Sequence, residues 1–298
     1  MIEIVIPFRS RSIGVMDVRR VLPFPKRRSV GPFVFVDDFG PVEIVRDRSL
    51  DVLPHPHIGL ATVTYLLSGK MTHRDSLGTR QIIEPNEVNW MSAGRGIVHS
   101  ERVSDAPVKA GEKLVGLQTW VALPENAEES APTFAHHKSD DLPVVEADGA
   151  QVKIILGEAF GKKSRVETLS NPLYVECRMA DKKRVQIPAQ IEERSVYILS
   201  GALLIDGKRF EAGTMVVFLE NVEVWVEALG ATVCMIIGGD RLEKPRYMWW
   251  NFVSTSRERI ERAKEDWRAQ NFGAIPGDAE EFVPLPDDNN PKPVPQPL

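Results

Sequence analysis

The chain has 298 residues, of which 43% are hydrophobic and 27% are charged. Because a domain usually holds about 100 to 200 residues, this length predicts two globular domains. The formal net charge of -5, from 37 basic and 42 acidic residues, argues against direct binding to nucleic acid, which requires a positive face.

Cysteine use and hydropathy indicate the compartment. Cys177 and Cys234 are too few for a disulfide framework or a cysteine-rich zinc site, and both lie in apolar or mixed segments typical of core thiols. The N-terminal segment lacks the order of a secretory signal, and the apolar runs are too short to span a bilayer. We therefore expect a soluble cytoplasmic protein that does not bind membranes.

Short apolar or alternating runs recur along the chain, separated by Gly, Pro, Asn and Asp. They include residues 32–36, 62–67, 114–122, 152–156, 195–199, 214–219 and 222–228. Short strands at regular spacing with turn residues between them are typical of an all-β sandwich or barrel. One helix is predicted at about residues 256–269, with Thr255 and Glu258 as a capping-box pair. Its apolar stripe consists of Ile260, Ala263 and Trp267.

Part of the chain is repeated. Residues 65–69 read YLLSG and residues 197–201 read YILSG. At the same offset, His55-Pro56-His57 falls on Ile187-Pro188-Ala189, so the second copy keeps the proline and has lost both histidines. The duplication predicts two similar antiparallel β-barrels in tandem.

Proline, glycine and charged residues mark the predicted boundaries. We expect a first barrel over residues 1–135 and a second over 141–245, followed by a segment with the helix over 246–283. The tail, residues 284–298, is rich in proline and has no aromatic residue. Such a composition cannot bury a core, so this tail is predicted to be extended or disordered.

Two pairs of polar residues carry the chemistry of the first copy. His55 and His57 are two residues apart, as are His99 and Glu101, and residues i and i+2 of a strand face the same side. Three imidazoles and one carboxylate on one face suit a divalent transition metal such as Fe, Mn, Ni, Cu or Zn. The alternative is that these are ordinary solvated histidines, because each two-residue motif is common by chance.

Other candidates are weaker. His73 lies just before a turn, so a structural role is favoured over metal ligation. His136 and His137 fall in a predicted loop and are expected to be solvated. The sequence Gly94-Arg95-Gly96 is interpreted as a tight turn rather than a phosphate-binding loop, because no helix begins after it.

Residues 55–101 closely resemble the pirin family of the cupin superfamily, through HPHIGLATVTYLLSGKMTHRDSLG and WMSAGRGIVHSE. GPFVFVDDFGP and WWNFVSTSRERIERAKEDW, at residues 31–41 and 249–267, agree with it. The resemblance implies a bicupin of two jelly-roll β-barrels with a metal, usually iron, in the N-terminal barrel only. The family's metal ligands match His55, His57, His99 and Glu101.

The chain departs from the family pattern at three positions. Ile58 and Ala61 stand where relatives usually carry Arg and Glu, and Asp38 stands where His is common. These departures predict a changed pocket or changed surroundings of the metal.

The resemblance implies two classes of function. The first is a quercetin 2,3-dioxygenase, in which Glu101 takes the 3-hydroxyl proton of a flavonol, the ring opens with dioxygen and carbon monoxide leaves. Trp90 and Met91 are candidates to line its cavity, with core packing as the alternative for Trp90. The second is an iron-dependent redox sensor that is read by a protein partner and needs no turnover. A third option is a cupin that acts on another small enol.

Overall fold

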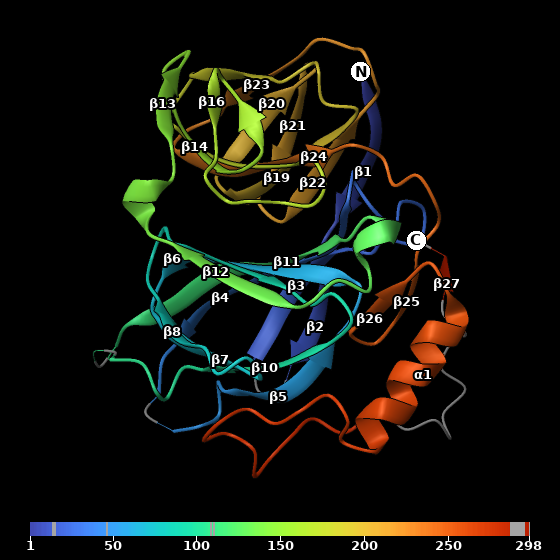
Figure 1. Cartoon of the computed structure of the whole chain (residues 1–298). Helices are drawn as coiled ribbons and strands as arrows, with labels where there is room; N and C mark the ends of the chain where they lie inside the picture. The colour runs from blue at the N-terminus through green and yellow to red at the C-terminus, as the bar shows by residue number, and fades with distance from the viewer. Residues whose placement is uncertain (14–15, 46, 108, 110, 287–295, 298) are drawn as a thin grey trace. The chain divides into compact units, whose positions relative to one another are not determined.

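The computed structural model describes residues 1–13, 16–45, 47–107, 109, 111–286 and 296–297. It consists mainly of antiparallel strands with a single longer helix near the C-terminus of the described chain, so the predicted all-β fold is confirmed (Figure 1). No helix in the described part is long and apolar enough to cross a membrane. The chain divides into two compact units.

The unit that carries the histidine pairs comprises residues 12–18, 39–136 and 243–298. Its four-stranded sheet has the order β5-β10-β7-β8. Most residues of the seven-stranded sheet, with the order β12-β9-β6-β11-β4-β3-β2, also belong to this unit. The strands of the first sheet are β5 (Val52–His57), β7 (Met71–Asp75), β8 (Arg80–Ile83) and β10 (Ile97–Arg102). Those of the second are β2 (Arg9–Ile13), β3 (Met16–Leu22), β4 (Phe33–Glu43), β6 (Leu60–Ser68), β9 (Val88–Ser92), β11 (Lys113–Ala122) and β12 (Thr133–His137).

The other unit comprises residues 1–11, 19–38 and 137–242. Its sheets have the orders β1-β22-β19-β24-β17-β14-β13 and β18-β23-β20-β21, and a hairpin joins β15 to β16. The strands of its large sheet are β1 (Ile2–Pro7), β13 (Val144–Ala147), β14 (Ala150–Leu156), β17 (Pro172–Met179), β19 (Glu193–Ser200), β22 (Thr214–Phe218) and β24 (Thr232–Gly239). The remaining strands are β15 (Glu158–Ala159), β16 (Lys162–Lys163), β18 (Arg184–Ile187), β20 (Ala202–Ile205), β21 (Lys208–Glu211) and β23 (Val224–Ala228).

The first predicted boundary differs from the structure. β1 pairs with β22, Ile6 facing Met215, so the N-terminal strand belongs to the unit of the second barrel rather than to a domain of residues 1–135. Pairing between strands so far apart in sequence leaves no local signal. Two short 3-10 turns, η1 (Glu125–Ala127) and η2 (Ser139–Asp141), lie near residue 137, where the chain passes between units.

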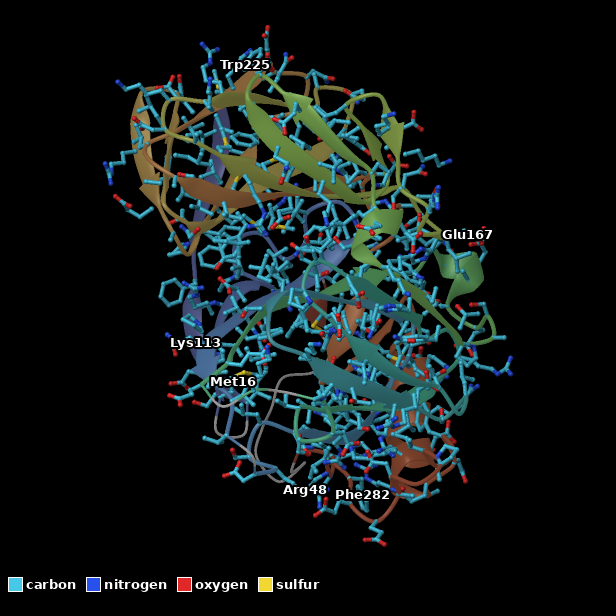
Figure 2. All side chains as sticks on the ribbon, turned by 90° about the vertical axis from the view of Figure 1, so that its left-hand side faces the viewer. Met16, Arg48, Lys113, Glu167, Trp225 and Phe282 are labelled. Carbon is cyan, nitrogen blue, oxygen red and sulfur yellow. The ribbon has the colours of Figure 1, made fainter. Side chains whose placement is uncertain are left out.

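The two barrels share one topology, as the repeat predicts. β6 and β19, which contain most of the repeated pentapeptide, occupy the same central place in their sheets, and β5-β10-β7-β8 matches β18-β23-β20-β21 strand for strand. Where His99 faces His55 in the first barrel, Val224 faces Ile187 in the second. Both of these apolar residues are fully buried in the second core. Trp225, which lies between Val224 and Val226 in β23, is on the outside (Figure 2).

The predicted helix is present as α1 (Arg257–Arg268), and Ile260, Ala263 and Trp267 are buried as expected. It packs with the hairpin β25 (Tyr247–Trp249) and β26 (Phe252–Ser254). Its N-cap is Ser256, which accepts from the amide of Arg259, so the predicted cap at Thr255 is wrong. The Thr255 amide and hydroxyl instead donate to the buried carboxylate of Glu128.

Most of the predicted tail lies outside the described residues. Its described end, β27 (Gln296–Pro297), pairs with Met248 and Tyr247 of β25.

Candidate metal centre

Two imidazoles come from β5, an edge strand of the four-stranded sheet. His55 and His57 face the same side because side chains alternate along a strand. The residue between them, Pro56, has no N–H to donate, and an edge strand tolerates proline because only one side of it is paired. The motif HPH therefore fits an edge strand that presents two imidazoles to the barrel interior.

The third imidazole comes from the neighbouring strand. His99 of β10 is the direct register partner of His55, and their ring centroids are 4.3 Å apart. The His57 and His99 centroids are separated by 5.0 Å. One candidate ligand atom from each of these three histidines lies within 4.8 Å of the others, and all three residues are buried. The structure thus brings together three of the four residues that the sequence singles out.

Glu101 follows His99 by two residues on β10, but its carboxylate is not a member of that close group. Its Oε1 accepts a hydrogen bond from the Thr64 hydroxyl at 3.3 Å. Burial raises the pKa of Glu101 to about 7, against the lowering effect of the Thr64 hydrogen bond. Ligation of a metal by Glu101 stays a prediction.

The imidazoles fit a metal ion. Both ring nitrogens of His99 are buried without a hydrogen-bond partner among the described residues, an arrangement that costs free energy unless something binds them. Burial lowers the pKa of His99 well below its ordinary value and that of His55 to about 4, so both rings are neutral near pH 7. Neutral imidazole is the form that binds metals. The donor set suits a divalent transition metal without selecting one.

The ring of His55 is held in one tautomer. Its Nδ1 lies 2.8 Å from the carbonyl oxygen of Leu53. Since a carbonyl can only accept, Nδ1 carries the proton and Nε2 keeps its lone pair. A backbone carbonyl on the far nitrogen is the usual way in which a ligating histidine is oriented.

His73 lies closer to the centre than the sequence suggests. β7 pairs with β10, which places its ring centroid 5.3 Å from that of His99. Its Nε2 and Asp75 Oδ2 are 2.9 Å apart, and its ring stacks on Phe134 at 4.4 Å. It is not part of the close group of three histidines, so a supporting role remains the interpretation.

The wall of the interior contains residues that the sequence does not reveal. Thr64 also donates to Gln118 at 2.9 Å, and the ring of Trp120 meets His57 edge-on at 5.1 Å. Both β11 residues sit in a segment that reads as a plain apolar strand. Only the pairing of β6 with β11, which places Gln118 opposite Thr64, could have found them.

The two candidate cavity residues on β9 face opposite ways. Met91 pairs with Thr62, which shares the face of Thr64, so Met91 points to the interior. Trp90 pairs with Val63 and points to the other face of the sheet. Core packing, the alternative interpretation, therefore holds for Trp90.

The side chains of Ile58 and Ala61 lie outside the interior. Ile58 packs into the apolar cluster formed with Phe252 and Ile260 beside α1. Ala61 is three residues from Thr64 on β6, so it points to the opposite face of the strand. The expectation of a changed pocket is not met at these positions, because both side chains point away from the imidazoles.

The remaining candidates have structural surroundings. Asp38, in the unit of the second barrel, accepts from the Tyr197 hydroxyl and pairs with Arg19, each at 2.7 Å. His136 is half-buried in β12 rather than solvated in a loop, and its Nδ1 lies 2.8 Å from Asn89 Oδ1. Arg95 lies in a turn, where its amide donates to Ser130 and its carbonyl accepts from Arg259.

Comparison with known families gives two matches along the chain. Residues 15–121 match the Pirin family model, and residues 174–273 match the model of the Pirin C-terminal cupin domain. Together the two matches follow the two copies of the repeat.

Individual relatives agree with the family models. A pirin-like protein from Caulobacter vibrioides is 43% identical over 96% of this chain and 100% of its own length. Human pirin is 32% identical over 89% of this chain and 91% of its own. Among solved structures, a quercetin 2,3-dioxygenase from Acinetobacter baumannii superposes with a TM-score of 0.87 at 34% identity, covering 95% of each chain.

Proposed function

Because the chain belongs to the pirin family of bicupins, we propose that it is a metal-dependent dioxygenase of the quercetin 2,3-dioxygenase type. The observation that carries the proposal is the buried group of His55, His57 and His99, in which neither ring nitrogen of His99 bonds to any residue that the structure describes. The likeness to the Acinetobacter baumannii dioxygenase supports the reaction class.

In this proposal the three histidines and Glu101 hold one divalent metal, with Fe(II) as the first choice. A set of three neutral nitrogens and one carboxylate leaves coordination positions open, as catalysis at a metal requires. The bound ion supplies Lewis acidity and the redox capacity that a reaction with dioxygen needs.

The residues around the ion handle the substrate proton. The carboxylate of Glu101 takes the proton of the flavonol 3-hydroxyl, as the anionic acceptor beside the imidazoles. Thr64 orients that carboxylate through its hydroxyl. Trp120 and Met91 offer apolar surface to a flat aromatic substrate, since both face the interior. Overall, flavonol and dioxygen give the ring-opened ester and carbon monoxide.

The test is oxygen uptake by Fe(II)-loaded protein with quercetin, followed in parallel by loss of the flavonol absorbance. We expect uptake that disappears in His99→Ala and survives in His137→Ala, a histidine at the end of β12 outside the group. Glu101→Gln should retain metal and lose turnover. Full turnover by metal-loaded Glu101→Gln would refute a carboxylate base. No uptake with iron bound would refute the flavonol substrate.

The competing idea of a redox sensor loses one of its two supports. It rested on family precedent and on Ile58 and Ala61 as signs of a pocket unfit for turnover. Both residues point away from the imidazoles. The same preparation distinguishes the two functions, because a sensor would change its affinity for a protein partner on iron oxidation without consuming quercetin.

A further inference from the structure

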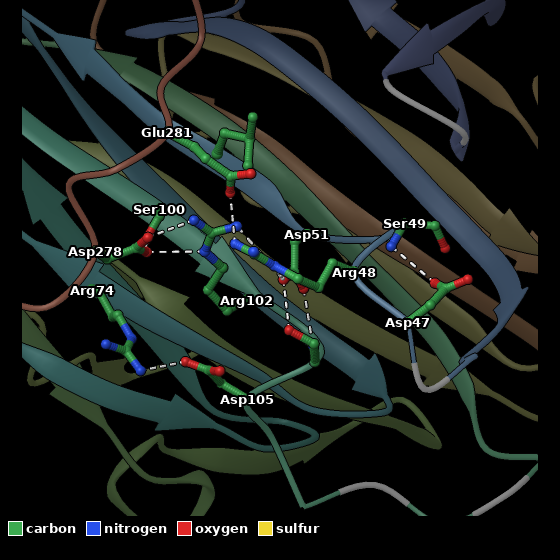
Figure 3. A network of polar contacts seen from close by, with 12 residues as sticks. Asp47, Arg48, Ser49, Asp51, Arg74, Ser100, Arg102, Asp105, Asp278 and Glu281 are labelled. Atoms are coloured by element: carbon green, nitrogen blue, oxygen red, sulfur yellow. Dashed lines mark hydrogen bonds and ion pairs between the residues drawn. The ribbon is translucent and has the colours of Figure 1, made fainter.

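After α1 the chain crosses the strands that carry the candidate ligands. We call residues 274–286 the C-terminal strap. Asp278 and Glu281 of the strap bond to Ser100 of β10 and to Arg48 in the loop before β5 (Figure 3). The amide of Val283 bonds to the carbonyl of Pro54 in β5. Phe282 lies at the surface (Figure 2). The strap contacts β5 and β10, the two strands from which all four candidate ligands come.

The first contact is at an irregularity in β5. His99 of β10 faces His55 of β5, whereas Glu101 faces Val52. An advance of two residues along β10 therefore corresponds to an advance of three residues along β5. Leu53 and Pro54 occupy this bulge. A bulge leaves backbone groups without their ladder partners. The Leu53 carbonyl accepts from the His55 ring at 2.8 Å, and the Pro54 carbonyl accepts from the Val283 amide at 2.8 Å.

The bulge therefore has two partners with different roles. One of its carbonyls sets the tautomer of His55, and the next carbonyl is tied to the strap. The strap is in turn anchored to α1, because the indole N–H of Trp267 donates to the carbonyl of Val283 at 3.1 Å. A continuous set of hydrogen bonds thus runs from the helix through Val283 to the residue before His55.

The second contact is on β10. Ser100 and Arg102 alternate with His99 and Glu101, so their side chains leave the opposite face of the strand. Both donate to Asp278: Ser100 at 2.6 Å, and Arg102 through Nε at 2.9 Å and through a terminal nitrogen at 2.5 Å.

Asp278, Ser100 and Arg102 form a clamp whose two β10 members are buried and which is connected to the start of β5. The Ser100 side chain is inaccessible, and only 3% of the Arg102 side chain is exposed. Arg102 also lies 3.6 Å from Asp51, which directly precedes β5. Asp51 in turn accepts from the amide and hydroxyl of Ser104 (Figure 3).

We propose that the C-terminal strap is part of the metal centre: Asp278 and the Val283 amide fix β10 and the β5 bulge from outside the barrel and so set the spacing of the histidines. The inference rests on the proposed metal site. Asp278 is 178 residues from Ser100 in the chain, and it acts as a positioning residue that touches no ligand. Partners that hydrogen-bond directly to a ligand typically account for about 10- to 100-fold in metal affinity, and for Asp278, which acts through β10, we expect an effect at the lower end of this range.

The first test is calorimetric titration of the metal-free full-length protein with nickel(II). We expect Asp278→Ala to bind nickel about 10-fold or more weakly than the parent. Asp278→Asn keeps the shape of the side chain and one acceptor oxygen, so its nickel affinity should lie between those of the parent and Asp278→Ala. It replaces the alanine variant in this test if that variant does not fold. Glu281→Ala removes an exposed ion pair with Arg48 from the same strap and should bind nickel like the parent.

A destabilised fold is separated from a displaced ligand by a second control and a second readout. Glu193→Gln removes the buried negative charge that pairs with Arg27 and one of the two oxygens that accept from Arg27 and Gly31 in the second barrel, and it should lower stability without changing nickel affinity. With cobalt(II) at saturation, the visible absorption bands should differ between Asp278→Ala and the parent, because they report ligand geometry rather than stability.

The Val283 contact has its own matched pair. Val283→Pro deletes the backbone N–H that donates to the carbonyl of Pro54, whereas Val283→Ala keeps this N–H and removes only side-chain atoms. We expect weaker nickel binding from the proline variant alone. Equal affinity and equal cobalt spectra in the parent and all strap variants would overturn the inference and leave the proposed function standing. A parent protein that binds no metal would refute the proposed function itself.

Discussion

The hydroxyl of Thr64 lies 3.3 Å from the carboxylate of Glu101, and it lies 2.9 Å from Gln118 on the other side. One hydroxyl hydrogen serves one acceptor at a time, so Thr64 shares its donor between the two. We expect Thr64→Val to retain the metal and lower kcat about 10-fold, because the carboxylate loses its orienting contact.

The control for this substitution is Thr119→Val on β11. Thr119 pairs with Val63, so it points to the face opposite Thr64, and its buried hydroxyl has no hydrogen-bond partner in the described part of the chain. This variant should turn over like the parent. Equal kcat values for both variants at equal metal content would show that the Thr64 contact does not affect turnover.

Removal of the metal should destabilise the protein. A ligand that binds only the folded state adds about 2.7 kcal/mol at a free concentration 100 times its Kd. For a chain of this size that corresponds to a rise in Tm of about 5 to 10 °C. Differential scanning calorimetry with iron(II) and with a chelator should show this difference in the parent. His99→Ala should have the same Tm with iron(II) and with the chelator. If the parent protein also has the same Tm under both conditions, this would contradict a metal at this site.

Ile58 should affect stability and leave the metal centre unchanged. It is 1% exposed and packs in the cluster beside α1, so Ile58→Ala should lower the free energy of unfolding by about 3 kcal/mol. Ile260→Ala makes the same change in the same cluster from the helix and should cost a similar amount. Urea denaturation measures both. A change in nickel affinity or in KM for quercetin that occurs only in Ile58→Ala would show that this position shapes the pocket after all.

The contact of Asp278 with Ser100 and Arg102 should make the free energy of unfolding depend on pH. Burial raises the pKa of this carboxyl, but the hydrogen bonds from Arg102 and Ser100 outweigh it, and the net shift is downward. The ionised form therefore stabilises the fold above the unfolded pKa of about 3.9, and this stabilisation disappears as the pH falls through the lower folded value. Asp278→Asn should be less stable than the parent by about 1 kcal/mol at pH 6.

Urea denaturation at pH 6 and at pH 3 checks the sign of this dependence. The gap between Asp278→Asn and the parent should narrow at the lower pH. For Glu281→Gln, which removes a solvent-exposed pair, we expect a small gap at both values. A gap for Asp278→Asn that widens in acid would mean that burial dominates the pKa of this carboxyl.

Much of the fold could be predicted from local patterns. The repeated pentapeptide indicates two barrels because β6 and β19 are equivalent strands, and the stripe of Ile260 and Trp267 indicates the packed face of α1. The position of β1 could not be predicted, because its partner β22 is about two hundred residues away and an edge strand pairs without a motif of its own.

The site was predictable to the same extent. Residues spaced two apart on strands must share a face, which is why His55, His57 and His99 could be recognised before the structure. Thr64 and Gln118 could not, since their roles depend on which strands lie side by side. The strap was hidden for another reason: residues 274–286 have no regular hydrophobic period, and their hydrogen bonds to β5 and β10 join residues far apart in the chain.

The replacement of His55 and His99 by Ile187 and Val224 gives equivalent positions of the two barrels different tolerances to mutation. In a saturation mutagenesis experiment, substitutions at Ile187 and Val224 would lower the cellular abundance of the protein, because the second core requires side chains of a particular volume and apolarity. Changes at the histidines would abolish metal binding, and they would lower abundance only through the loss of the stabilising metal. Equivalent positions of the two barrels would therefore give different patterns of tolerated residues within a single polypeptide.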